Sequence, residues 1–195
     1  RDYKVTGVQT CALPILITND NVHNAHYNYS VSMWLFIKST PSNHVITNDG
    51  YVDIMSFDGQ PKIEYNVKEN KLRISMVKSK KPETKSISTP EPEDQVNIIY
   101  SVPLQRWNNI VVNYDGGTYD LYFNDQLIAN YKNITPIVGV RNVYVGSDNG
   151  MRGGLCNLVY FPWHLSRERI SANYDLFKNK RPPILGDAEI VSKIR

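Results

Sequence analysis

The sequence predicts an all-β fold, an antiparallel sandwich of two sheets followed by a short C-terminal helix. Many short runs of alternating or β-branched residues are separated by turn residues, which is typical of sandwiches. The 195 residues include 13 tyrosines, 11 glycines and 11 prolines, a composition that favours strands and turns over helices. A clear hairpin signature in the middle of the chain is the third observation that predicts this fold.

The hairpin is predicted around Asp115-Gly116-Gly117-Thr118, which two alternating runs flank. Two central glycines supply the positive φ angles that a two-residue hairpin turn requires. This turn places three apolar pairs on one face: Tyr114 with Tyr119, Val112 with Leu121, and Ile110 with Phe123. The opposite face, called here the hairpin polar face, carries Asn109, Asn113, Asp120, Tyr122 and Asn124. Because side chains alternate along a strand, we expect the apolar face in the core and the hairpin polar face at the surface.

The rest of the chain predicts strands on both sides of this hairpin. Strand-like runs precede it at residues 27–38, 45–46, 51–57, 62–67, 71–77 and 96–102, and follow it at residues 126–131, 142–146 and 155–161. Residues 78–95 are rich in Lys, Glu, Ser and Pro and hold few large apolar side chains. We expect an exposed insertion there, because such a segment buries too little surface to offset its ordering entropy.

A short helix is expected near the C-terminus. Ser166 is a good N-cap residue for it. Ile170, Tyr174 and Phe177 follow at i, i+4 and i+7 and share one helical face. A pair of prolines ends this pattern, so residues 181–195 are interpreted as a tail.

Residues 1–15 are interpreted as an artefactual leader. The stretch VTGVQTCALPI matches the in-frame translation of a widely used short-read sequencing adapter. A damaged secretory signal is the competing interpretation, because CALPILI is short and apolar, but the basic region and long apolar core of a signal peptide are missing. The folded domain is therefore expected to span residues 16–180.

Charge and cysteine content limit the classes of partner. The formal net charge of +3 is too small to indicate binding to nucleic acid, and no apolar run is long enough to span a bilayer.

Without the leader, Cys156 is the one remaining cysteine, and its apolar neighbours predict a small buried residue. The glycosylation sequons Asn28-Tyr29-Ser30 and Asn133-Ile134-Thr135 slightly favour an extracellular or lumenal location.

Several short motifs follow one another in a characteristic order. They are Trp34, Trp107 with residues 110–112, Asp115-Gly116, residues 121–124, Val145-Gly146, residues 153–155 and residues 165–170. In this order and spacing the chain resembles the concanavalin A-like lectin/glucanase superfamily, specifically laminin-G-like domains, over residues 27–177. The resemblance implies a jelly-roll of two antiparallel sheets. The sequence is also similar to uncharacterised open reading frames of large DNA viruses and marine metagenomes, which adds a virion-associated location to those favoured.

Carboxylates suited to glycoside hydrolysis are not found in the expected pattern. Glycoside hydrolases of this superfamily present paired carboxylates from one strand, as in E-x-D-x-E, and no predicted strand carries this motif. We therefore expect no enzymatic activity. Some laminin-G-like domains bind calcium through rim loops, so the resemblance makes Asp148 and Asn149 candidate Ca²⁺ ligands, although Asp-Asn-Gly suits a turn equally well. No other cofactor is expected.

These observations predict a non-catalytic recognition module that binds carbohydrate or a protein partner, such as a glycan or glycoprotein surface. The hairpin polar face is the candidate ligand-binding site, because sugars have polar edges and apolar faces. Its four amide or carboxylate side chains suit the polar edges, and Tyr122 suits the apolar face. Two alternatives stay open: a structural domain of a viral or cell-surface assembly without a small ligand, and a glycoside hydrolase.

Overall fold

Two sheets pack face to face in the computed structural model, which describes residues 8–11, 25–38, 50–57, 61–77, 95–135, 137–138, 143–146 and 151–184. The six-stranded sheet contains, in spatial order, β1 (Val8–Cys11), β13 (Gly153–Phe161), β3 (Asn28–Ile37), β8 (Trp107–Asp115), β9 (Thr118–Phe123) and β10 (Gln126–Tyr131). The five-stranded sheet contains β12 (Val143–Val145), β4 (Tyr51–Phe57), β5 (Lys62–Asn66), β6 (Lys71–Val77) and β7 (Gln95–Ser101). β2 (Ala25–His26) and β11 (Ile137–Val138) form a separate ribbon.

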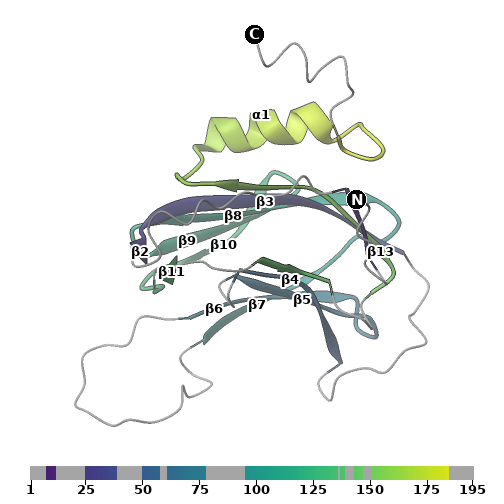
Figure 1. Cartoon of the computed structure of the whole chain (residues 1–195), viewed down its shortest axis with the longest axis horizontal. Helices are drawn as coiled ribbons and strands as arrows, with labels where there is room; N and C mark the ends of the chain where they lie inside the picture. The colour runs from purple at the N-terminus through teal and green to yellow at the C-terminus, as the bar shows by residue number, and fades with distance from the viewer. Residues whose placement is uncertain are drawn as a thin grey trace.

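Helix α1 (Arg167–Phe177) lies on the outer side of the six-stranded sheet, which makes that sheet the middle layer of the molecule (Figure 1). The predicted all-β sandwich with a short C-terminal helix is therefore confirmed. All described strand pairs in the two large sheets are antiparallel except β1 with β13, which is parallel.

Strand β1 lies inside the stretch interpreted as a leader. It pairs with β13 at the edge of the six-stranded sheet, where an edge strand offers unpaired backbone groups to any extended segment. Backbone pairing of this kind does not require complementary side chains. The interpretation of residues 1–15 as a leader stays a prediction.

The central hairpin has the predicted register. Val112 pairs with Leu121, and Val111 pairs with Tyr122 on the other face. Gly116 and Gly117 have φ angles of +52° and +93°, so both central turn residues occupy the left-handed region that a two-residue turn demands. The local turn chemistry therefore sets the pairing of β8 with β9.

The main core lies between the two sheets. Leu121 is fully buried and Val112 is 1% exposed, and they share one apolar cluster with Phe57, Ile63 and Leu72 of the opposite sheet. Burial of apolar surface is the dominant favourable term in folding. The apolar face of the hairpin is therefore confirmed as core.

A second apolar layer joins α1 to the outer face of the six-stranded sheet. Ser166 is the N-cap of the helix, as predicted, and accepts a hydrogen bond from a backbone N–H of the first turn. Ile170 packs in a cluster with Tyr122, and Phe177 packs in a cluster with Trp34. The predicted apolar face of the helix thus contacts side chains of the sheet.

Some expectations lie outside the described residues: the strand at residues 45–46 and all but the last residue of the insertion at residues 78–95. In the part of the chain that the structure describes, no helix combines the length and apolar character needed to cross a membrane.

Replacing Leu121 by Ala should lower the free energy of unfolding by about 2–5 kcal/mol, because the smaller side chain leaves a cavity between the sheets. The matched control is Leu127→Ala on β10, where the leucine is 52% exposed and the loss should stay below about 0.5 kcal/mol. Urea unfolding of the two variants measures the difference, and equal losses would contradict the observed packing.

Candidate functional site

The hairpin polar face is covered by α1 and the segment before it, so the prediction of an open surface there is wrong. Asn109, Asn113 and Tyr122 are only 3%, 5% and 8% exposed, and Asp120 and Asn124 are half-buried. The physical reason is that Leu165 and Ile170 pack onto Val111 and Tyr122 from a segment far along the chain.

Asn113 holds the segment before α1 on the sheet through hydrogen bonds. Its Nδ2 donates to the Leu165 carbonyl at 2.9 Å, and its Oδ1 accepts from the Leu165 N–H at 2.9 Å. Ser30 adds to this contact, since its Oγ donates to the Trp163 carbonyl at 3.1 Å and accepts from the Leu165 N–H at 2.9 Å. Asn113 therefore has a structural role in this conformation.

The other amides of the hairpin polar face also bond to the protein itself. Asn109 Nδ2 donates to the Met33 carbonyl at 3.1 Å. Asn124 Oδ1 accepts from the Asn109 N–H at 2.8 Å, and Asn124 Nδ2 donates to Asn108 Oδ1 at 3.0 Å. Asp120 accepts from the side chain of Asn130. These hydrogen bonds join the hairpin polar face to neighbouring parts of the same sheet.

An ion pair completes the attachment of the helix. The Arg167 guanidinium donates to Asp125 and lies 5.6 Å from the centroid of the Tyr122 ring, while Ser171 Oγ donates to Asp125 at 2.9 Å. The hydrogen bond from Arg167 lowers the pKa of the Asp125 carboxyl from its usual value. The ion pair between Arg167 and Asp125 and the contact with Tyr122 thus both hold this side of α1 in place.

The outer face of the five-stranded sheet, called here the five-strand face, has no described helix or strand over it (Figure 1). Antiparallel pairing aligns Asp53 on β4, Glu64 on β5 and Arg73 on β6 in one row across the sheet. Lys62 belongs to the adjacent row. These four charged residues form the centre of the five-strand face.

A network of ion pairs holds these side chains in place. Arg73 donates to both oxygens of Glu64, from Nε at 2.8 Å and from Nη2 at 3.0 Å. Lys62 Nζ lies 2.8 Å from Glu64 Oε1 and 3.0 Å from Asp53 Oδ1. The side chain of Glu64 is 7% exposed, whereas those of Lys62 and Asp53 are 37% and 49% exposed. The network is therefore buried at Glu64 and reaches solvent at Lys62 and Asp53.

Aromatic and neutral polar groups surround this network. The guanidinium of Arg73 lies 3.8 Å from the centroid of the Tyr51 ring, a cation–π contact that orients both groups. Ser75 Oγ donates to Asn97 Oδ1 at 2.7 Å in the row of Lys62. The five-strand face therefore combines charged, amide, hydroxyl and aromatic groups on strands.

The five-strand face was not predicted from the sequence. Its signal was present, because charged or polar residues alternate with apolar ones in β5, where Ile63 and Tyr65 flank Glu64. That alternation indicates which side of the strand faces outward. It does not indicate that Glu64 meets Arg73 and Lys62, since strand register creates that contact.

The charge environment keeps Glu64 ionised. Burial by itself raises the pKa of this carboxyl, but the hydrogen bonds from Arg73 and Lys62 together outweigh burial and leave the pKa below its usual value. A carboxylate in this state accepts hydrogen bonds and does not donate a proton near neutral pH.

The candidate calcium ligands Asp148 and Asn149 lie outside the described residues. Among the residues that are described, no group of three or more His, Cys, Asp or Glu side chains is placed to hold a metal ion. The calcium site stays a prediction.

A protein-family model described as the concanavalin A-like lectin/glucanases superfamily matches residues 14–171 of the chain. This match covers the described strands from β2 to β13 and the first part of α1. No curated protein matches the sequence.

Solved structures with similar folds include a candidate carbohydrate binding protein from Bacteroides ovatus, at 10% identity and TM-score 0.52, over 77% of this chain and 42% of that one. The binding domain of Paraclostridial Mosquitocidal Protein 1 matches at 12% identity and TM-score 0.55, over 80% and 39%. A Trypanosoma rangeli sialidase reaches a TM-score of only 0.44 at 13% identity, over 76% and 22%, which is too low to support an inference. The chain spans less than half of each of these structures, and the likeness shows the fold alone.

Replacing Asn113 by Ala should lower the free energy of unfolding by about 1–3 kcal/mol, because the buried Leu165 carbonyl loses its side-chain donor. Amide hydrogen exchange in α1 should also accelerate. The control is Asn130→Ala, which removes an exposed side-chain contact and should cost less than about 0.5 kcal/mol. Unchanged exchange in α1 would show that Asn113 does not hold the helix.

The stability of the protein should fall as the pH drops below about 4, with Glu64 contributing to this acid limb. Because the folded-state pKa of Glu64 is lowered, its contribution is present above the unfolded-state pKa and is lost as the pH falls through the folded-state value. Urea unfolding at a series of pH values should show a shallower acid limb for Glu64→Gln. Equally steep limbs in both proteins would contradict this role.

Proposed function

Because the chain belongs to the concanavalin A-like lectin/glucanase superfamily, we propose that it is a non-catalytic module that recognises carbohydrate through the five-strand face. The observation that carries this proposal is the fixed network of Asp53, Lys62, Glu64 and Arg73 beside Tyr51, on a sheet face that no described helix or strand covers. The fold likeness to a candidate carbohydrate binding protein agrees with it.

The chemistry of the five-strand face suits a sugar. A pyranose presents hydroxyl groups at its edge, which pair with carboxylates and cationic nitrogens, and an apolar face, which packs on an aromatic ring. Asp53 and Lys62 offer partly exposed ends for the hydroxyl groups, and the half-buried Tyr51, whose ring Arg73 contacts on one face, supplies the aromatic group. Because ion pairs already order these side chains, binding costs less conformational entropy than it would on a mobile surface.

The balance of charge favours a neutral glycan over an acidic one. Two acidic residues, Asp53 and Glu64, face two basic residues, Lys62 and Arg73, and each charge lies beside one of opposite sign. An acidic sugar would be attracted to Lys62 and Arg73 but repelled by the neighbouring carboxylates. A neutral polysaccharide or the neutral glycan of a glycoprotein avoids this conflict.

The ionised state of Glu64 supports recognition without catalysis. Asp53 and Glu64 both bind the ammonium group of Lys62, so they lie close together, as the paired carboxyls of retaining glycosidases do. Such enzymes also need one carboxyl with a raised pKa to protonate the leaving group. The pKa of Glu64 is instead lowered by Arg73 and Lys62 against the effect of burial. Glu64 is therefore suited to ordering Lys62 and Arg73, and Asp53, whose side chain is 49% exposed, is the carboxylate that can accept from hydroxyl groups.

A glycan array of neutral and acidic sugars, followed by calorimetric titration of the bound sugar, tests the proposal. Asp53→Asn and Tyr51→Ala should each weaken binding about tenfold, the effect of losing about 1.4 kcal/mol of contact. The matched controls are Asp175→Asn on α1 and Tyr131→Ala on β10, both on exposed side chains of other surfaces, and they should bind as the unchanged protein does.

Two results would overturn the proposal. Binding that is insensitive to Asp53→Asn and Tyr51→Ala would remove the site from the five-strand face. Release of reducing ends from a bound oligosaccharide, abolished by Glu64→Gln, would show that the protein is a glycoside hydrolase.

A further inference from the structure

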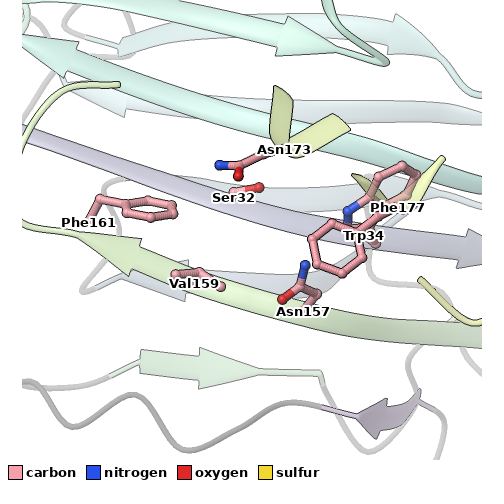
Figure 2. A pocket seen from close by; sticks show the side chains of 7 residues that line it. All are labelled: Ser32, Trp34, Asn157, Val159, Phe161, Asn173 and Phe177. Carbon is pink, nitrogen blue, oxygen red and sulfur yellow. The ribbon is translucent and has the colours of Figure 1, made fainter. Parts of the chain in front are cut away.

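A small pocket lies between α1 and the outer face of the six-stranded sheet, on the side of β3 and β13 (Figure 2). Its volume is about 70 Å³. Trp34, Val159, Phe161 and Phe177 form its apolar wall. Ser32, Asn157 and Asn173 supply its polar groups. This helix-side pocket is separate from the five-strand face, which belongs to the other sheet.

The two amides are the chemically distinctive part of the helix-side pocket. Asn157 enters it from β13 and Asn173 enters it from α1 (Figure 2). Neither side chain makes a hydrogen bond to any other described residue. A half-buried amide with no partner among the described residues retains one carbonyl acceptor and two N–H donors for a ligand.

The backbone at Asn157 adopts a strained conformation at a β-bulge beside the pocket. The pairing of β13 with β3 shifts between Cys156 and Val159, which is a β-bulge, and Asn157 has a φ angle of +49°. A residue other than glycine in this region is uncommon and costs free energy. Bulges commonly redirect a side chain beside a binding site. Here the bulge residue is one of the two unpaired amides.

The size of the helix-side pocket selects a small group. A volume of about 70 Å³ is about half that of a cavity of about 150 Å³ that holds benzene, so the pocket suits a small group better than a whole sugar ring. An acetamido group combines a methyl group, which suits the aromatic wall, with a C=O and an N–H, which suit the two amides. We propose that the helix-side pocket binds the acetamido group of an N-acetylated sugar.

An exposed aromatic ring next to the pocket accommodates the rest of the sugar. Phe161 lines the pocket, and the ring of Trp163 lies 6.0 Å from it, centroid to centroid, with 48% of Trp163 exposed. A pyranose anchored by its acetamido group can lay its apolar face on this indole. The free amides, the bulge and the neighbouring tryptophan therefore point to the same ligand class. The proposal does not rest on sugar binding at the five-strand face.

NMR titration of the ¹⁵N-labelled full chain with N-acetyl-D-glucosamine tests this assignment. The indole N–H resonance of Trp34 should shift and saturate, whereas D-glucose, which lacks the acetamido group, should leave it in place. Asn157→Gly removes one amide while keeping the positive φ, and should weaken the association about tenfold, the effect of one lost hydrogen bond. Asn173→Ala and Trp163→Ala should weaken it as well.

The matched control is Asn133→Gly, the same substitution at an exposed residue with a φ angle of +63° beyond β10, and it should leave binding unchanged. Tyr51→Ala should also leave it unchanged, which separates this pocket from the five-strand face. The proposal is overturned if the Trp34 resonance does not saturate, if D-glucose acts equally, or if Asn157→Gly binds normally. A response to N-acetyl-lysine as strong as that to the sugar would overturn the sugar assignment.

Discussion

The hydrogen bonds between Asn113 and the backbone of Leu165 determine which surfaces of this domain are available. They hold the segment before α1 against β8, and the helix then covers the outer face of the six-stranded sheet. A buried amide that satisfies both the N–H and the C=O of one residue is directional, whereas apolar packing is not. The position of the helix follows from this contact together with the burial of Ile170 and Phe177.

Because α1 covers the outer face of the six-stranded sheet, the outer faces of the two sheets have different roles. The five-stranded sheet keeps an outward network of ion pairs, in which Glu64 is buried beneath Lys62 and Arg73. Such pairs contribute little net stability where they are exposed, but they fix the orientation of groups that a ligand can use. On the other sheet, the helix does not seal the surface completely. It leaves a pocket beside Trp34 whose amide groups come from a strained bulge and from the helix.

Elements governed by local chemistry were predictable from the sequence. The Gly116-Gly117 turn set the register of the hairpin, and alternation from that turn correctly placed Leu121 in the core. Ser166 and the spacing of Ile170 and Phe177 correctly predicted the start and the buried face of α1. Cys156 is fully buried, as its apolar neighbours indicated. Each of these predictions depends on residues within one or two turns or strands, where backbone geometry is repetitive.

The sequence by itself determined that the hairpin has one apolar and one polar face, because strand side chains alternate with a period of two. The tertiary structure decided what covers the polar face. Asn113 contacts Leu165 across a separation of 52 residues. No local pattern could therefore show whether Asn113 is a buried structural residue or an exposed binding residue. Similarly, alternation in β5 turned Glu64 outward, but only the register with β4 and β6 brought it to Asp53 and Arg73. The direction of a side chain is a local property, whereas its burial and the residues it contacts depend on which distant segments pack together.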